Sequence, residues 1–243
     1  MKTKLLYLDD SYLKSMDAEI LEVDSPSHGL FRLVLDQTVF YPIGGGQATD
    51  QGKLWTDSWQ GKVQEVVMKD GEVRHFVTSN VPPKVGEKVK GEIDWERRYK
   101  LMKIHSGGHV VDFAMHLLGY SPSLLMPIKG DHGKKACIVY QWTISKDIRQ
   151  ELQDKSNELI KKDLQISWCF ATLDDLKKEA IYLQPGLPTN KPLRKITLEG
   201  VGSVADGGTQ VRKTSEVGVI EILSVVQEVD TTIVNYRISP TSQ

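Results

Sequence analysis

The chain has 243 residues, of which 40% are hydrophobic and 26% charged, with a formal net charge of −1 at pH 7. These values are ordinary for a globular protein, and the length suffices for one large domain or two smaller ones. The balanced charge excludes a chain coated in positive charge, although a local basic patch could still bind nucleic acid. The apolar runs are far shorter than the roughly 20 residues that a membrane-spanning helix needs.

The N-terminal stretch MKTKLLYLDDSYLKSMD becomes acidic after one short apolar run, and no small-residue cleavage site follows, so we expect no signal peptide. The two cysteines, Cys137 and Cys169, show neither metal-binding nor redox spacing. Ordinary thiols of this kind are typical of a reducing compartment. We therefore expect a cytoplasmic protein that does not contact a membrane.

Residues 1–92 are predicted to form mostly β-strands. Short and often alternating runs with β-branched residues are separated by Gly, Pro, Asp, Ser and Asn. The dipeptide Asp70-Gly71 indicates a tight hairpin. Several short strands in succession favour a small antiparallel barrel or sandwich, and we interpret this segment as an N-terminal β-barrel domain.

Residues 93–243 are predicted to form an α+β domain with helices packed on an antiparallel sheet, which makes the whole chain α+β. A helix is expected over 94–118, with Asp94 as its N-cap and Gly119 as its C-terminal stop. A second helix is expected over about 147–164 and a short helical or turn segment around 174–180. The expected strands are 136–142, 166–172, 194–200, 217–229 and 231–239, with a Pro-rich loop at 184–192.

The stretch HSGGH places His105 and His109 four residues apart, on one face of the predicted helix. Neutral imidazoles at this spacing can hold one metal ion, although ordinary core or surface histidines give the same pattern. Gly107 and Gly108 each cost a helix about 1 kcal/mol relative to alanine. We therefore expect a neighbouring backbone or a substrate to pass close to this part of the helix.

Two later segments offer further polar groups. In VADGGTQV, Asp206 presents a carboxylate and Gln210 an amide oxygen, while an ordinary hairpin-type turn would have the same composition. In LMPIKGDHGKKA, Lys129 and His132 belong to a small basic loop, and solvated surface is the simpler interpretation of that cluster.

A glycine-rich segment, TVFYPIGGGQATDQG, lies in the predicted barrel. Its three glycines are followed by Gln47 and Asp50, and such a backbone can approach a ligand closely. It is not a P-loop, because no GK[ST] follows, and no βαβ unit surrounds it. A flexible surface loop is the alternative interpretation.

The order of four motifs resembles that of the free-standing alanyl-tRNA editing proteins. These motifs are FYPIGGGQATDQG, WERRYKLMKIHSGGH, KGDHG and DGGTQVRKTSEVG, and the resemblance covers nearly the whole chain. It is strongest to the medium-length AlaX type, which has an N-terminal glycine-motif domain and is related to the editing domains of alanyl- and threonyl-tRNA synthetases. The resemblance implies a barrel domain followed by an editing domain.

The resemblance also implies a metal site. In this family an HxxxH pair and a later CxxxH pair hold one zinc ion. His105 and His109 match the first pair, whereas Asp206 stands at the cysteine position and Gln210 at the second histidine position. One Zn²⁺ held by these four residues is the implied cofactor. Because oxygen ligands are harder, we expect weaker zinc binding, acceptance of other divalent ions, or a metal-free site.

The remaining implied site residues fall into two groups. The catalytic group is His105, His109, Gln47 and Asp50. The substrate-binding group is Gly44, Gly45, Gly46, Ser106, Gly108, Lys129, His132 and Thr209. The family often has threonine where this chain has Gly108, which predicts a roomier or differently selective pocket.

The implied activity is ATP-independent hydrolysis of mischarged tRNA(Ala), above all Ser-tRNA(Ala) and also Gly-tRNA(Ala), with the tRNA acceptor end as partner. No Ser-His-Asp or Cys-His pattern indicates a covalent nucleophile, so we expect positioning and water activation. One alternative is a non-catalytic aminoacyl-tRNA-binding protein with a degenerate zinc site. Another is an editing enzyme for a different mischarged tRNA. We expect no obligate protein partner, and a monomer or weak dimer.

Overall fold

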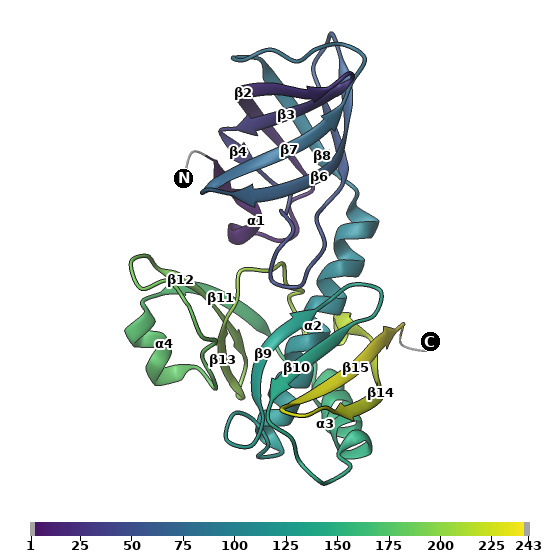
Figure 1. Cartoon of the computed structure of the whole chain (residues 1–243), viewed down its shortest axis with the longest axis vertical. Helices are drawn as coiled ribbons and strands as arrows, with labels where there is room; N and C mark the ends of the chain where they lie inside the picture. Colours follow the sequence, from purple (N-terminus) through teal and green to yellow (C-terminus); the bar gives the residue numbers. More distant parts are fainter. Residues whose placement is uncertain (1–2, 241–243) are drawn as a thin grey trace. The chain divides into compact units, whose positions relative to one another are not determined.

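The computed structural model describes residues 3–240, and the chain divides into two compact units, one up to Lys100 and one from Leu101 onward (Figure 1). Each unit contains its own antiparallel strands, and the helices are α1 (Leu6–Asp9), α2 (Trp95–Leu117), α3 (Arg149–Lys161) and α4 (Leu173–Glu179). Among the described residues no helix is both long and apolar enough to cross a membrane. The α+β class predicted from the sequence is confirmed.

The first unit is built around a closed antiparallel barrel with the strand order β2-β3-β7-β6-β5-β8. Its strands are β2 (Ser15–Ser27), β3 (Leu30–Leu35), β5 (Gly52–Trp55), β6 (Gln60–Lys69), β7 (Glu72–Thr78) and β8 (Lys88–Ile93). A short parallel pair, β1 (Lys4–Leu5) and β4 (Gln37–Thr38), accompanies the barrel. Closure leaves none of the six barrel strands with an unpaired edge.

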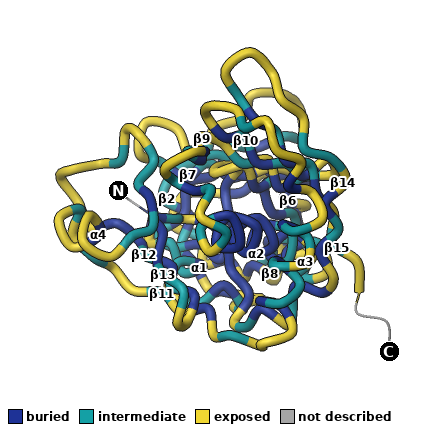
Figure 2. Tube along the Cα trace, turned by 90° about the horizontal axis from the view of Figure 1, so that it is seen from below, coloured by how far each residue is buried: buried dark blue, intermediate teal, exposed yellow. Residues whose placement is uncertain are grey.

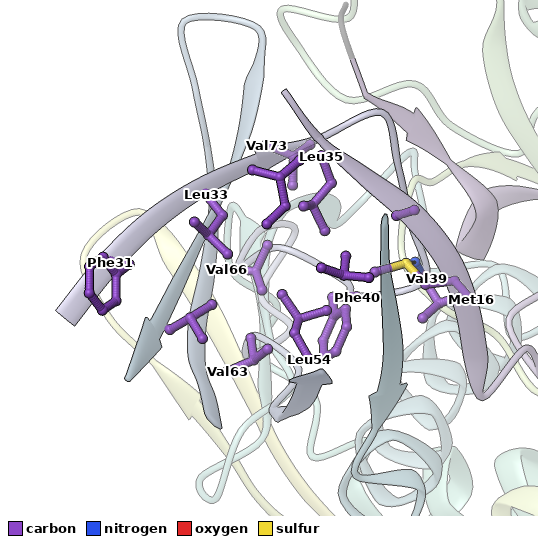
Figure 3. Close-up of a cluster of buried hydrophobic side chains, with 14 of the residues drawn as sticks. Met16, Phe31, Leu33, Leu35, Val39, Phe40, Leu54, Val63, Val66 and Val73 are labelled. Atoms are coloured by element: carbon purple, nitrogen blue, oxygen red, sulfur yellow. Dashed lines mark hydrogen bonds between the residues drawn. The ribbon is translucent and has the colours of Figure 1, made fainter. Parts of the chain in front are cut away.

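Alternation along the strands explains why the barrel closes. In β8 every second residue is buried, and β7 shows the same alternation of buried and half-buried positions. The inward side chains form one apolar cluster that includes Leu33, Leu54 and Val66, all fully buried (Figure 3). Asp70 and Gly71, with φ of 54° and 78°, make the tight turn between β6 and β7, as their sequence predicts.

Helix α2 starts where the sequence predicts. Oδ1 of Asp94 accepts a hydrogen bond of 3.0 Å from the backbone N–H of Arg97, which satisfies one of the free donors of the first turn. The helix ends before Gly119, whose φ of +78° is the left-handed conformation that favours glycine. Trp95–Lys100 belong to the first unit, and the rest of the helix belongs to the second.

The second unit contains a four-stranded antiparallel sheet with the order β14-β15-β10-β9. The strands are β14 (Val219–Gln227), β15 (Thr231–Ser239), β10 (Cys137–Gln141) and β9 (Met126–Asp131). Most of α2 in this unit is buried, and Figure 2 shows it as a largely buried segment. Side chains on both faces of this part of the helix are therefore enclosed by protein rather than by water.

Helix α3 covers the outer edge of this sheet with carboxamide side chains. Asn157 donates to the carbonyl of Ile220 at 2.7 Å and accepts from its N–H at 3.0 Å. Gln153 accepts from the N–H of Ile222 at 3.1 Å. The edge strand β14 thus has backbone groups satisfied by side chains instead of by a further strand.

A second sheet has the order β11-β12-β13, with β11 (Ile166–Ala171), β12 (Leu193–Leu198) and β13 (Gly202–Ala205). Helix α4 packs here through Leu176, which lies in an apolar cluster with Leu193 and Ala205. Thr172 caps α4 by accepting a hydrogen bond of 3.1 Å from the N–H of Asp175.

Two strands differ from the sequence expectation. The segment expected to be a basic loop contains β9, and the segment before the DGGTQ motif contains β13. Both are edge strands, where Pro127 in β9 and Gly202 in β13 are tolerated, and neither has the alternating apolar pattern that identifies a strand. DGGTQ itself is not a hairpin turn, because it leads from β13 into a 3-10 helix, η1 (Thr214–Val217).

Candidate metal centre

Three side chains that could hold a metal ion converge in the second unit. His105 and His109 project from α2, and Asp206 follows β13. One donor atom from each lies within 4.8 Å of the other two. Oδ1 of Asp206 is 3.2 Å from Nε2 of His105 and 3.6 Å from Nε2 of His109. The cluster forms because His105 and His109 lie four residues apart on one helix and because the fold places Asp206, directly after β13, against them. The sequence predicts these three positions to meet.

His109 is the least satisfied member of the cluster. Both of its ring nitrogens are buried and have no hydrogen-bond partner among the described residues, since 3.6 Å to Asp206 is too long for one. Burial acts to lower the pKa of His109, but the neighbouring Asp206 carboxylate outweighs burial and raises it. Burial likewise opposes ionisation of Asp206, yet the two imidazoles hold the pKa of that carboxyl well below its usual range.

The second oxygen of Asp206 is held by its own loop. Oδ2 accepts a hydrogen bond of 2.8 Å from the backbone N–H of Gly208 and one of 2.9 Å from Nε2 of Gln210. Oε1 of Gln210 in turn accepts from the hydroxyl of Ser106 at 2.7 Å. Gln210 therefore lies beside the cluster, where the sequence places it, with its amide nitrogen rather than its oxygen facing the carboxylate.

Arg194 fastens the DGGTQ segment to β12. Its guanidinium donates to the carbonyl of Gly208 at 2.6 Å and lies 5.1 Å above the ring of Trp168. The backbone N–H of Asp206 also donates to the carbonyl of Arg194 at 3.0 Å. These contacts hold an irregular segment in place, and no local pattern in the sequence identifies Arg194 as their source.

A third imidazole, His132, stacks on His105 with ring centroids 4.3 Å apart. The hydroxyl of Tyr236 donates to the carbonyl of Ile104 at 2.9 Å, so it must accept from Nδ1 of His132, 2.9 Å away. This fixes the proton of His132 on Nδ1. Burial, aided by the two neighbouring histidines, lowers the pKa of His132 well below its usual value.

Glycines make room for these rings. A Cβ atom at Gly208 would lie 2.0 Å from Cε1 of His105, and one at Gly108 would lie 2.6 Å from Cε1 of His132. A Cβ at Gly130 would lie 2.6 Å from Nε2 of the same ring. Contacts this short do not occur, so each of the three motifs needs its glycine for imidazole packing.

The expectation that a substrate or a backbone passes over Gly107 and Gly108 therefore requires correction. Side chains occupy both positions: a Cβ at Gly107 would meet Ile238 at 3.2 Å and Val217 at 3.3 Å. A Cβ at Gly108 would meet the hydroxyl of Tyr236 at 2.8 Å as well as His132. The cost of two glycines in a helix is offset by close packing of neighbouring side chains.

Asp112 lies less than one turn beyond His109 and forms a buried network that the sequence does not reveal. Its carboxyl accepts from the hydroxyls of Tyr140 at 2.6 Å and Tyr182 at 2.9 Å. Burial raises the pKa of Asp112. The two tyrosines come from distant parts of the sequence, so only the fold brings them together.

The glycine-rich segment of the first unit is a tight turn. Gly44 and Gln47 exchange backbone hydrogen bonds of 3.2 and 2.9 Å, and Gly45 and Gly46 have φ of 53° and 76°. The three glycines are exposed, whereas the side chain of Gln47 is buried. The segment is therefore ordered by its own hydrogen bonds instead of forming a flexible surface loop.

Asp50 has a structural explanation. It is fully buried and pairs with the equally buried Arg98, whose Nε lies 3.0 and 2.9 Å from its two oxygens. The backbone N–H of Tyr41 donates to the same carboxylate at 2.7 Å. With its oxygens engaged in this way, the geometry gives no support to the catalytic role expected for Asp50.

The remaining predicted substrate residues lie in different settings. Lys129 is exposed on β9, and Thr209 is fully buried in the DGGTQ segment. Ser106 is also fully buried, and its hydroxyl accepts from the N–H of Val211 at 3.0 Å. Within the second unit, Ser106, Gly108, His132 and Thr209 are the predicted substrate residues that lie in the cluster's packing or next to it in the sequence.

The cluster fits a divalent metal ion by its chemistry. Two imidazole nitrogens and one carboxylate oxygen form a common donor set for zinc and for other first-row divalent ions. The unpartnered nitrogens of the buried His109 are the observation that favours such an ion, because buried polar atoms normally have partners. The residues able to hold it are His105, His109 and Asp206.

A closed β-barrel followed by an α+β unit with a His-His-Asp cluster defines a two-unit α+β protein with a candidate metal site, and this fold alone does not define a function. Comparison with known proteins identifies the family. Residues 11–97 match the family described as tRNA synthetases class II (A). The alanyl-tRNA editing protein AlaX-M of Saccharolobus solfataricus is 34% identical over 229 residues, which cover 92% of this chain and 93% of that protein.

Two longer relatives match as well. AlaX-L of Pyrococcus horikoshii is 32% identical over 222 residues, covering 90% of this chain and 53% of that protein. The alanine–tRNA ligase of Halobacterium salinarum is 34% identical over 234 residues, covering 92% of this chain but 24% of the ligase. The chain thus spans about a quarter of the length of that ligase. It belongs to the free-standing alanyl-tRNA editing protein family, as its motif order predicts.

Proposed function

We propose that this protein is a trans-editing hydrolase that deacylates mischarged tRNA(Ala), Ser-tRNA(Ala) first and Gly-tRNA(Ala) second. The observation that carries the proposal is the cluster of the buried His105 and His109 with the partly buried Asp206, whose donor atoms lie within 4.8 Å of one another. Membership of the editing family supports the tRNA ester as substrate. Zinc is the proposed ion, held by these three residues, with Gln210 next to them.

A divalent ion bound here would supply a Lewis acid and lower the pKa of a bound water. The residues of the chain hold the ion's ligands in place. His105 and His109 hold their rings on one face of α2, and Gly208 lets the DGGTQ segment approach His105 closely. An aminoacyl ester is already an activated carbonyl compound, so positioning and water activation suffice without a covalent nucleophile.

On the substrate side, His132 is the best-supported candidate among the predicted residues. Because its proton is held on Nδ1, its Nε2 in the neutral ring is a hydrogen-bond acceptor, and the ring itself stacks on His105 of the cluster. We propose that it helps position the aminoacyl end. Lys129, exposed on β9, is proposed to meet tRNA phosphates, a contact that should weaken as salt rises. The Gly44–Gly46 turn and Gln47 remain predicted substrate contacts.

The direct test measures deacylation of Ser-tRNA(Ala), Gly-tRNA(Ala) and Ala-tRNA(Ala) by the full chain, purified without chelator and assayed with and without added zinc. The expected result is release of serine, slower release of glycine and sparing of the alanyl ester. Metal content is measured on the same preparation. If no mischarged tRNA(Ala) is cleaved with or without zinc, the proposal fails.

Two variants sharpen this test. His109→Ala should lose both metal and hydrolysis, because the replaced ring supplies one donor of the cluster. The matched control is His116→Ala, which removes another histidine of α2 whose Nδ1 lies 3.2 Å from the carbonyl of Ser121, outside the cluster. Hydrolysis that survives His109→Ala would contradict a metal-centred mechanism. RNA binding without metal or hydrolysis would instead indicate a non-catalytic tRNA-binding protein.

A further inference from the structure

We infer that Gln210 and Ser106 are positioning residues that orient Asp206 toward the metal, and that Gln210 is not itself a ligand. The site would then have three protein ligands, two imidazoles and one carboxylate oxygen, with the remaining coordination positions left for water and substrate. This inference rests on the proposed function only in assuming that the cluster binds a divalent ion. It concerns which residues of this chain hold that ion.

Ser106 is linked to Asp206 through Gln210, and the donor and acceptor of each hydrogen bond in this series can be assigned. The backbone N–H of Val211 can only donate, so Oγ of Ser106 accepts at 3.0 Å. The hydroxyl proton of Ser106 is then free to donate to Gln210, 2.7 Å away. Oδ2 of Asp206 already accepts from the backbone N–H of Gly208, and the amide atom of Gln210 that faces the same oxygen at 2.9 Å is its NH₂ group.

These hydrogen bonds determine which atom of Gln210 could reach a metal ion. Its oxygen is directed at Ser106, and the nitrogen that faces Asp206 carries two protons and has no lone pair suitable for a metal. For Gln210 to coordinate through its oxygen, the amide would have to turn and point its oxygen at the carboxylate. Two oxygens with lone pairs would then face each other in a buried site, which is unfavourable.

The network also separates the two oxygens of Asp206. Oδ2 accepts from the N–H of Gly208 at 2.8 Å and from Gln210, while Oδ1 faces the two imidazoles at 3.2 and 3.6 Å. One oxygen is thus used for positioning and the other is left for the ion. Residues that orient a ligand in this way typically change metal affinity by about 10–100-fold when they are replaced.

Ser106 links the two motifs. It lies on α2 directly after His105, and its hydroxyl reaches the segment that carries Asp206. Because Ser106 is fully buried, water does not readily replace this bond. The helix therefore positions two ligands through its own turns and the third through the side chain of Ser106.

The test measures Zn²⁺ affinity of the full chain by competition with a chromophoric chelator, and Co²⁺ binding by visible absorption. The variants are Gln210→Leu, Gln210→Glu and Ser106→Ala. Ser156→Ala is the matched control, since Ser156 is a fully buried helical serine whose hydroxyl bonds the carbonyl of Leu152 at 2.7 Å. Circular dichroism confirms that each variant is folded.

The inference expects Gln210→Leu and Ser106→Ala to weaken Zn²⁺ binding by about 10–100-fold, and Ser156→Ala to leave it unchanged. The Co²⁺ absorption bands of Gln210→Leu, at saturating metal, should match those of the wild type, because the ligands are the same. Gln210→Glu should weaken binding, because it replaces a donor by a second negative charge beside Asp206.

The opposite results would overturn the inference. If Gln210 is a ligand, Gln210→Leu shifts the Co²⁺ bands, and Gln210→Glu tightens binding because a carboxylate is the better ligand. Failure of the wild type to bind either ion also overturns it. Metal binding with the expected Co²⁺ spectra, but without hydrolysis of any mischarged tRNA, would defeat the proposed function and leave the inference standing.

Discussion

Each unit places a carboxylate among cationic or potentially cationic groups, fully buried in the case of Asp50 and partly buried in the case of Asp206, and the two sites differ in how completely that charge is matched. In the first unit, Asp50 faces the guanidinium of Arg98, which is always charged, and accepts the N–H of Tyr41. In the second, Asp206 faces two imidazoles that can be neutral. The first arrangement suits a permanent structural pair, whereas the second presents the donor set that we propose holds a metal ion.

The largest expected effect comes from breaking the structural pair. Asp50→Ala and Arg98→Ala should each lower the free energy of unfolding of the first unit by about 3–5 kcal/mol, because each leaves a fully buried charge without its partner. Arg98 also donates to the carbonyls of Ser11 at 2.9 Å and Val39 at 2.6 Å, which would lose a donor. Urea denaturation followed by tryptophan fluorescence measures the change.

The same substitution at the carboxylate of the second unit, Asp206, sharpens this comparison. Asp206→Ala, measured in the same way without added metal, should cost less than Asp50→Ala, because the imidazoles it leaves behind can remain neutral. Equal losses from Asp50→Ala and Asp206→Ala would mean that the two carboxylates have the same structural role. That outcome would contradict the contrast drawn between them.

A second prediction concerns His75, a fully buried ionisable side chain of the barrel. Burial, partly offset by the carbonyl of Leu33, lowers the pKa of His75 from 6.5 to about 4. The unfolded chain therefore binds a proton near pH 6.5 that the folded chain does not bind until about pH 4. The contribution of His75 to the free energy of unfolding is fully present above pH 6.5. It falls by about 3 kcal/mol as the pH drops from 6.5 to 4.

The measurement compares wild type with His75→Gln in urea denaturation at several pH values between 7.5 and 4.5. The variant keeps an amide that can bond Thr38, whose hydroxyl lies 2.8 Å from Nε2 of His75. The difference between the two free energies of unfolding should change by about 1.4 kcal/mol per pH unit within the window. A difference that does not depend on pH would show that His75 is not the group responsible.

The third prediction uses two adjacent glycines of the DGGTQ segment. A Cβ at Gly208 would meet the ring of His105, whereas one at Gly207 would meet nothing within 4 Å. Gly208→Ala should therefore cost about 1–3 kcal/mol through overpacking and weaken metal binding, while Gly207→Ala should change neither appreciably. Denaturation and zinc competition measure both effects. Similar behaviour of the two variants would contradict the packing explanation.

The smallest effect is expected from an exposed ion pair of the barrel. Lys53 and Glu92 lie 2.9 Å apart, with side chains 45% and 47% exposed. Lys53→Ala should change the free energy of unfolding by less than about 1 kcal/mol, since solvent screens such pairs. A loss comparable to that of Arg98→Ala would mean that burial is not what distinguishes the two pairs.

Much of the fold could be predicted because it follows from local signals. The Asp70-Gly71 turn, the Asp94 cap and the Gly119 stop are each determined by the conformational preferences of a few residues. The strands β9 and β13 could not be identified, because their pairing with β10 and β12 is a property of the tertiary structure. Short edge strands carry little periodicity of their own.

The site residues likewise fall into those that local sequence signals predict and those that only the tertiary structure reveals. His105 and His109 follow from helical spacing, and Asp206 follows from the resemblance of its motif. The roles of the glycines could not be predicted, since only the fold shows that His132 stacks on His105 and fills the space beside Gly108. Sequence spacing indicates which residues can meet on one helix, but not what a distant strand places against them.

The carboxamides of α3 have a consequence for how copies of this protein behave together. An uncovered β14 would present a row of backbone donors and acceptors to which another chain could add a strand, a route to fibrous aggregates. Asn157 and Gln153 occupy part of that row. Resistance of a concentrated solution to this kind of aggregation is therefore aided by two uncharged side chains of a helix that contributes nothing to the His-His-Asp cluster.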